Sequence, residues 1–420
     1  MVKNKIMTMT DSSLRTGFGT VMYNIDYGLA EAGFDVSQIA WGFRHETSIP
    51  RANHMLLPCG NDPNQPFGSD VLPYYLQTFK PEVLLTQADT RMVSYIPQQL
   101  KQIPNKPLWV FYVVVDGSTW QIDGKPHWPK NWSDVIRQAD KVVAMSKYGQ
   151  SLLKAMDIES EVIYHGVDTT RFLPVPDEFK KSLRKQSGLG EDTFIFGGVF
   201  KSMQRKNPEK YLQAFKIFLE SRELTQKDRD RCILLLHTAP QPSGGGEYDL
   251  IEQSIDSGLQ VGKNIIFSNQ ALPMEQMQLI YQAVDVFIHL GTMEGFGLPI
   301  IEAMSCGLPI VGVDSCTMTE IIGDCGLLSE VPRYKNGHPI KYGSYNGVEG
   351  DCVDPWDVAK QMLRLYKSEA LRKELGTKAT EKAVKEFDWT IIRKQWVDYM
   401  NKLIVKDEDI PAEWARLMNE

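Results

Sequence analysis

Two glutamates separated by eight positions, Glu294 and Glu302, have the residue type and spacing that point most directly to chemistry. They bound the stretch EGFGLPIIE, which holds two glycines and a proline. Glycine lets backbone N–H groups approach a ligand, and a helix N-terminus attracts anions such as phosphate. A carboxylate accepts hydrogen bonds from the hydroxyls of a sugar or ribose. The stretch therefore indicates a site for a phosphorylated, hydroxyl-bearing ligand, and the structural alternative is a tight turn with two solvated glutamates.

The proline predicts where the local helix begins. Proline is favoured in the first helical turn and glycine just after the last one, so we expect a short helix over residues 299–306 that ends at Gly307. Glu302 then lies in the first turn and Glu294 in the preceding loop. The two carboxylates can therefore approach the same helix end.

A basic segment, FKSMQRKNPEK, follows another expected strand and carries Lys201, Arg205 and Lys206. In open α/β sheets, ligands bind beyond the carboxyl ends of the strands. Fixed cations at such a place stabilise negative charge on a phosphate group. The alternative is a solvated basic loop.

Bulk properties exclude several classes of protein. The chain has 420 residues, enough for two to three domains, and a net charge of -7, which gives no general attraction to nucleic acid or anionic lipid. Its six cysteines form no CxxC pair, so a zinc site is not expected. We find no secretory signal and no apolar run that could span a membrane, and we predict a cytoplasmic protein.

Short apolar runs alternate with segments of helical periodicity, which predicts an α/β protein with parallel sheets. Residues 20–32 are one expected helix, and FLPVPDEFKK at 172–181 has the prolines and charges of a linker. We therefore predict domains at 1–172 and 181–390, followed by C-terminal helices at 391–420. A polar insertion at 329–352 is typical of a functional or mobile loop.

The run from Glu294 to Glu302 and the AMSCGLPIVGVDSCTMTEII that follows it resemble the Glu-x7-Glu signature of retaining glycosyltransferases of family four. KPEVLLT, ADKVVAMSKYGQSLL, VIYHGVDTTRFLP and RKNPEKYLQAF occur in the order of that family. The resemblance implies the GT-B fold, in which two Rossmann-like domains face each other across a cleft and a C-terminal helix crosses back to the first domain.

The resemblance also implies roles for residues of the second domain. Glu302 would bind the ribose of a nucleotide-sugar donor, and Glu294 would contact the transferred sugar. The N–H groups of four residues would hold the sugar and the distal phosphate: Gly295, Phe296, Gly297 and Leu298. His237 and Leu272 would lie near the nucleotide base.

The cations and the first-domain loop follow the family pattern less closely. Lys206 matches the family lysine, but Lys201 stands where the family has arginine, and Arg205 is adjacent, so the second cation is left open between them. Gly17 and Gly19 are expected in a loop that closes over the diphosphate from the first domain. Asp116 stands where many relatives carry a histidine that touches the donor sugar; it could accept a sugar hydroxyl, act as a base toward the acceptor, or simply cap a turn.

The sequence thus predicts a retaining glycosyltransferase that moves a sugar from a UDP- or GDP-sugar to an acceptor hydroxyl by front-face substitution. No metal is expected, because the Asp-x-Asp match at 228–230 lies in a charged connector. A soluble acceptor is favoured over a lipid. The alternatives are a sugar-nucleotide epimerase of the same fold and a glucosyltransferase that modifies nucleic acid, which the acidic charge disfavours.

Overall fold

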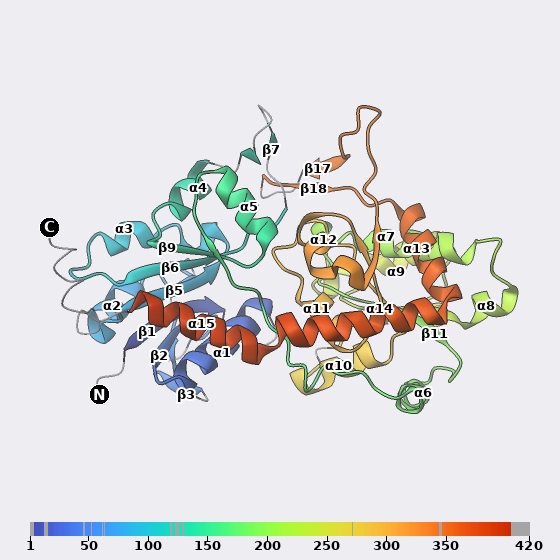
Figure 1. The fold of residues 1–420 in the computed structure, drawn as a ribbon, viewed down its shortest axis with the longest axis horizontal. Helices are drawn as coiled ribbons and strands as arrows, with labels where there is room; N and C mark the ends of the chain where they lie inside the picture. Colours follow the sequence, from blue (N-terminus) through green and yellow to red (C-terminus); the bar gives the residue numbers. More distant parts are fainter. Residues whose placement is uncertain are drawn as a thin grey trace.

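The protein is described from a computed structural model, which covers residues 4–11, 16–44, 47–51, 53–60, 62, 64–117, 120–121, 126–127, 130–270, 272–343 and 347–404. Figure 1 shows two α/β lobes side by side. The elements, contacts and counts are those of these residues.

An eight-stranded sheet forms the first domain, in the order β10-β9-β6-β5-β1-β2-β4-β3, and only the β3–β4 pair is antiparallel. The central strands are apolar on both faces, as strands covered by helices on both sides must be. The strands are β1 (Lys5–Asp11), β2 (Asp35–Trp41), β3 (Ile49–Arg51), β4 (His54–Pro58), β5 (Val83–Ala88), β6 (Leu108–Val113), β9 (Lys141–Ala144) and β10 (Glu161–Val162). A separate two-stranded pair joins β7 (Trp120–Gln121) to β8 (Pro126–His127).

The helices of the first domain connect these strands. They are α1 (Gly17–Glu31), α2 (Leu72–Phe79), the 3-10 turn η1 (Thr90–Val93), α3 (Ile96–Leu100), α4 (Lys130–Ile136) and α5 (Lys147–Ala155). The side chain of Thr16 caps α1 by accepting from Gly19 N, which satisfies one free N–H of the first turn. Gly17 and Gly19 therefore belong to the helix, and their predicted place in the preceding loop is wrong.

A six-stranded parallel sheet forms the second domain, in the order β13-β12-β11-β14-β15-β16. Its strands are β11 (Phe194–Val199), β12 (Cys232–His237), β13 (Ile265–Ser268), β14 (Val286–Ile288), β15 (Ile310–Val313) and β16 (Gly326–Ser329). The first five coincide with apolar runs of the sequence; β16, whose sequence GLLS is short and begins with glycine, does not stand out as one.

The helices and turns of the second domain include α11, which was predicted within one residue at each end. They are α6 (Asp177–Gln186), η2 (Gln204–Lys206), α7 (Pro208–Leu219), α8 (Gln226–Arg231), η3 (Pro242–Gly244), α9 (Leu250–Asp256), α10 (Met274–Gln282), α11 (Leu298–Ser305), α12 (Cys316–Ile322) and η4 (Gly323–Cys325). Because α6 begins at Asp177, the predicted linker is too long. Its charged second half forms the first turns of an amphipathic helix, with two acidic residues where the helix dipole favours them.

The chain ends in helices that return to the first domain. These are α13 (Pro355–Lys367), α14 (Glu369–Lys382), the π turn η5 (Ala383–Phe387) and α15 (Trp389–Leu403). Figure 1 shows α15, in red, running back along α1. Trp396 is fully buried and packs edge-on to Tyr112 of the first sheet, with ring centroids 4.9 Å apart. The predicted crossing-back is confirmed; residues 405–420 lie outside the described residues.

The insertion before α13 carries a hairpin of β17 (Lys341–Gly343) and β18 (Glu349–Asp351). Val348 and Met293 belong to the same hydrophobic cluster as the core of the first domain. The insertion is therefore attached to both domains. Among the described residues, none of the helices combines the length and apolar content needed to cross a bilayer.

Candidate active site

Glu294 is the centre of the site and lies in the loop between β14 and α11. Its side chain is buried, with 5% of its surface exposed. Oε2 accepts a hydrogen bond from Arg205 Nη1 at 3.2 Å, while Oε1 contacts Lys206 Nζ and lies 3.1 Å from His289 Nε2. A buried carboxylate is thus held by two cations and an imidazole.

Electrostatics keep this group ionised. Burial opposes the charge of Glu294, but Lys206, Arg205 and His289 outweigh it and hold the pKa of this carboxyl well below its usual range. Burial, with repulsion from Arg205, lowers the pKa of Lys206 to about 8. Burial also lowers the pKa of His289. At neutral pH the site therefore contains an anion and two adjacent cations.

The basic turn is fixed by Asn207, which has a left-handed backbone with φ of 51°. Its amide Nδ2 donates to Leu290 O at 2.7 Å and to Thr292 Oγ1 at 3.2 Å, both in the segment before Glu294. Asparagine tolerates this conformation better than most residues. Asn207 and His289 were not singled out from the sequence, although RKNP and DVFIHL contain them.

Of the two residues left open as the second cation, Arg205 is the one beside Glu294. Arg205 Nη1 also donates to Met293 O at 2.8 Å. Lys201 is exposed and makes no ion pair within the described part of the chain. The geometry favours Arg205, and separate alanine variants of Arg205 and Lys201 test this choice.

The glycine loop presents N–H groups that lack acceptors. Gly297 has φ of 99°, a conformation that side chains resist, and forms the N-cap of α11. No acceptor within the described residues pairs with the N–H of Gly295, Phe296 or Gly297. Because buried N–H groups are almost always paired, this loop is suited to an anion or a sugar oxygen.

Glu302 occupies the second turn of α11, since the helix begins at Leu298. Its predicted place in the first turn is therefore wrong, because the helix begins one residue earlier than predicted. Its Oε2 accepts from the Tyr281 hydroxyl, a contact that the sequence did not predict. Burial raises the pKa of Glu302 to about 6, and the Tyr281 hydroxyl moderates this shift.

This pKa predicts a pH dependence of donor binding if Glu302 accepts hydrogen bonds from ribose. We expect the Kd of a nucleotide-sugar to rise about five-fold as pH falls from 7.5 to 5, because protonation weakens the acceptor. Glu302→Gln should bind more weakly and show little dependence on pH. Calorimetry across this window measures both, and equal pH profiles would contradict the role.

The sign for folding is the opposite. A carboxyl with a raised pKa stabilises the folded free protein when protonated, so that contribution is complete below pH 4.5 and is lost as pH rises through about 6. Thermal unfolding without ligand therefore separates the effect on stability from the effect on donor binding.

The first domain approaches the glycine loop directly. A Cβ atom built on Gly17 would lie 3.3 Å from Leu298 Cδ1, so the start of α1 abuts the start of α11. A Cβ on Gly295 would lie 3.0 Å from Val114 Cγ1. Phe296 packs against His165, whose Nδ1 lies 2.8 Å from the Tyr112 hydroxyl. His165 is therefore a buried residue at the domain junction.

Asp116 follows β6 on the first-domain side. Burial raises its pKa to about 7; Arg205 opposes the shift, whereas Asp89 and Glu294 add to it. The charges of Arg205 and Glu294 in the second domain thus act on Asp116 in the first. Asp89, which directly follows β5, was not predicted.

The two residues predicted near the base lie at or beyond the carboxyl ends of two neighbouring strands of the second sheet, β12 and β13. His237 ends β12, and its Nδ1 lies 3.1 Å from Ser268 Oγ. Leu272 is half-buried in the segment between β13 and α10. Trp132, in the first turn of α4, packs against the first-domain core.

A carboxylate of α12 joins the two domains beside the site. Glu320 accepts hydrogen bonds from Lys147 N and Tyr148 N, both at 2.9 Å, and from the Tyr164 hydroxyl at 2.5 Å. It thereby caps the N-terminus of first-domain helix α5, where a negative charge is favourable. The sequence did not indicate this contact.

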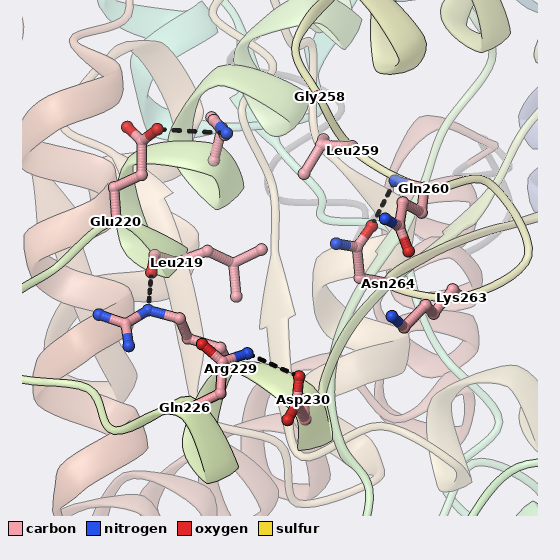
Figure 2. Close-up of a pocket in the computed structure, with 11 residues that line it drawn as sticks. Leu219, Glu220, Gln226, Arg229, Asp230, Gly258, Leu259, Gln260, Lys263 and Asn264 are labelled. Atoms are coloured by element: carbon pink, nitrogen blue, oxygen red, sulfur yellow. Dashed lines mark hydrogen bonds and ion pairs between the residues drawn. The ribbon is translucent and has the colours of Figure 1, made fainter.

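A pocket of 310 Å³ lies elsewhere, between α7, α8 and the segment before β13 (Figure 2). Its polar groups are paired locally: Arg229 Nε donates to Leu219 O at 2.7 Å, and Gln260 N to Asn264 Oδ1 at 2.8 Å. It opens at the amino ends of β12 and β13, the edge of the sheet opposite to the usual ligand edge. We assign it no function. Within the described residues, no three His, Cys, Asp or Glu side chains gather as metal ligands.

Comparison with known proteins identifies the class. Over 96% of this chain and 99% of the other, the fold is similar to sucrose-phosphate synthase from Thermosynechococcus elongatus, with a TM-score of 0.73 and 18% identity. It is also similar to Anabaena HepE, solved with UDP-glucose, with a TM-score of 0.69 and 16% identity over 95% and 99% of the chains. Two Rossmann-like domains with a returning helix define the GT-B fold, as predicted.

The family follows from sequence. Residues 179–382 match the family described as glycosyl transferases group 1, and this second domain belongs to that family. A 128-residue segment is 35% identical to O-antigen chain mannosyltransferase B of Escherichia coli, covering 30% of each protein. The matches to two other curated relatives cover 50% and 55% of the length of those relatives.

Proposed function

We propose that the protein is a retaining glycosyltransferase that uses a nucleotide-sugar donor. The observation that carries this proposal is the buried Glu294, paired with Lys206 and Arg205, next to three N–H groups without acceptors in the described loop. The cations suit a diphosphate, and the carboxylate suits the hydroxyls of the transferred sugar. The names of the similar proteins, a mannosyltransferase and a structure with UDP-glucose, support the same class of donor.

In the proposed mechanism, the glycine loop and the cations hold the diphosphate. As the bond between the anomeric carbon and the phosphate oxygen breaks, charge accumulates on that oxygen, and Arg205 and Lys206 stabilise it without reorganisation. Glu294 is already held by both cations and by His289, so it is better suited to bind sugar hydroxyls than to attack carbon. The acceptor hydroxyl then attacks the anomeric carbon from the face that the phosphate leaves. Its proton can pass to the departing phosphate oxygen, and the configuration at the anomeric carbon is retained.

Cations in place of a metal are part of this proposal, as is a cytoplasmic location. A sugar-nucleotide epimerase of the same fold would use similar donor contacts. It differs in one observable respect, because it converts the donor when no acceptor is present. A nucleic-acid acceptor is not favoured, given the net charge of -7.

Thermal unfolding with a panel of nucleotide-sugars tests the proposal. At 100 times its Kd, the correct donor should raise Tm by about 5 °C, because it binds only the folded state. UDP-glucose and GDP-mannose separate the two bases, and NAD is the control for a dinucleotide site. Chromatography of the incubated donor detects epimerisation. Stabilisation by NAD alone, or by no nucleotide-sugar, would refute the assignment.

A further inference from the structure

Two neighbouring strands of the first domain end in carboxylates that face the cations of the site. β5 and β6 pair with Ala88 opposite Val113, and Asp89 and Asp116 follow these ends. Both carboxylates are half-buried, and neither forms a salt bridge or a hydrogen bond with another described residue. The charge of Arg205 acts on both. They therefore border the space on the first-domain side of the reacting centre.

Buried polar groups without partners flank Asp89. Gln87 is fully buried, and both atoms of its amide lack a hydrogen-bond partner. The hydroxyl of Thr90, which is 4% exposed, also lacks one. An unpaired buried polar group costs free energy, so native proteins usually pair it with water or a ligand. This strand end is prepared to form hydrogen bonds that the protein itself does not supply.

The hairpin of β17 and β18 forms another side of this space. A Cβ atom on Gly117, directly after Asp116, would lie 3.0 Å from Glu349 O. Asp351 Oδ2 accepts from Ser315 Oγ at 2.6 Å, and the Tyr342 hydroxyl lies 3.1 Å from Thr292 Oγ1. The insertion is therefore anchored to the first domain, to the start of α12 and to the loop before Glu294.

Tyr148 at the start of α5 links these sides. Burial, followed by Cys316, Asp351 and Asp116, raises the pKa of its phenol. One tyrosine thus interacts electrostatically with carboxylates of both domains. An aromatic face with a few convergent polar groups is the usual lining of a small-molecule site.

The local charge is unfavourable for an anion. Asp89, Asp116 and Asp351 all carry carboxylates, and of the described cations that interact with them only Arg91, an exposed residue that acts on Asp89, has no ion pair. Arg205 is paired with Glu294, and Lys341 forms an ion pair with Asp351 at 3.2 Å. A phosphate on the acceptor would meet these carboxylates next to the diphosphate of the donor.

We propose that this space binds the acceptor, and that the acceptor is an uncharged polyhydroxyl compound, not a phosphate ester. Asp89 and Asp116 accept hydrogen bonds from its hydroxyls, and in their ionised form they repel a phosphate group. The inference rests on the proposed glycosyltransferase function. The same chemistry occurs in a free sugar or polyol and at the end of a glycan chain.

Matched acceptor pairs test the proposal with the nucleotide-sugar that stabilises the protein most. The pairs are glucose with glucose 6-phosphate and myo-inositol with its monophosphate, and mannose with mannotriose distinguishes a free sugar from a glycan end. Mass spectrometry of the products measures transfer. We expect at least a ten-fold higher kcat/KM for the uncharged member of a pair.

Variants connect the preference to the residues. Asp89→Asn should raise the acceptor KM about ten-fold and leave the donor-induced shift in Tm unchanged. Asp89→Lys should move the preference toward the phosphate ester. Asp134→Asn, on the surface of α4, is the matched control and should change neither. Three results with a donor that binds would overturn the inference alone: a preference for the phosphate esters, no transfer to any uncharged acceptor, or an unchanged preference in Asp89→Lys. If no nucleotide-sugar binds, the proposed function and the inference both fail.

Discussion

Replacing Arg205 by alanine should slow sugar transfer by a factor of about 10²–10³, the effect of removing one preorganised charge from a reacting oxyanion. Arg205 reaches Met293 O and Glu294 Oε2 with Nη1, and it acts on Asp89 and Asp116. Because its charge matters most when the phosphate leaves, kcat should fall far more than donor affinity. Steady-state kinetics with varied donor, together with calorimetry, measure the two effects separately.

Lys201→Ala is the matched control for Arg205→Ala. Both positions are basic residues in the segment between β11 and α7, but Lys201 is exposed and has no ion pair within the described chain. Its removal should change kcat less than two-fold. The reverse result, with a large loss for Lys201→Ala and a small one for Arg205→Ala, would show that Lys201 is the second cation and that the donor rearranges this loop.

The uncertainty about these two cations shows where sequence reasoning reaches its limit. The strand, the basic segment and the glycine loop were predicted because hydrophobic runs and turn residues are local signals. Which cation meets Glu294 depends on η2 and on the left-handed Asn207, which turn Arg205 and Lys206 toward the loop. No local pattern encodes that rotation.

Contacts between distant segments escaped prediction for the same reason. Glu320 caps a helix that is 172 residues away in the chain, and Tyr281 meets Glu302 from another helix. Gln87, whose side-chain amide lacks a partner, cannot be told from the sequence apart from other residues of a buried strand. By contrast, α11 was predicted nearly to the residue, because proline and glycine mark its ends.

The one-residue error in the start of α11 still mattered for function. With Leu298 as the first helical residue, Glu302 moves to the second turn and away from the free N–H groups. Glu294 and Glu302 therefore belong to different surroundings: the first is charged and fixed by cations, and the second is paired with a phenol and titrates near pH 6. The shared motif of the two glutamates did not indicate that their electrostatic roles differ.

Replacing Glu294 by glutamine should abolish transfer and also destabilise the fold by about 3–5 kcal/mol, the usual result of removing one partner from a buried ion pair. Lys206, with 11% of its side chain exposed, would keep a charge with no anion beside it. Its pKa, already lowered to about 8, should fall further, so the loss of stability should be smaller at pH 9 than at pH 6.5. Urea unfolding at the two pH values measures this difference.

The double variant Glu294→Gln with Lys206→Met separates folding from catalysis. Methionine fills the space of the lysine stem without its charge, so the stability lost in Glu294→Gln should be largely regained. Transfer should stay absent, because the groups proposed to hold sugar hydroxyls and phosphate are both missing. If the double variant regained activity along with stability, Glu294 would have only a structural role, and the chemistry would have to be carried by other groups of the cleft.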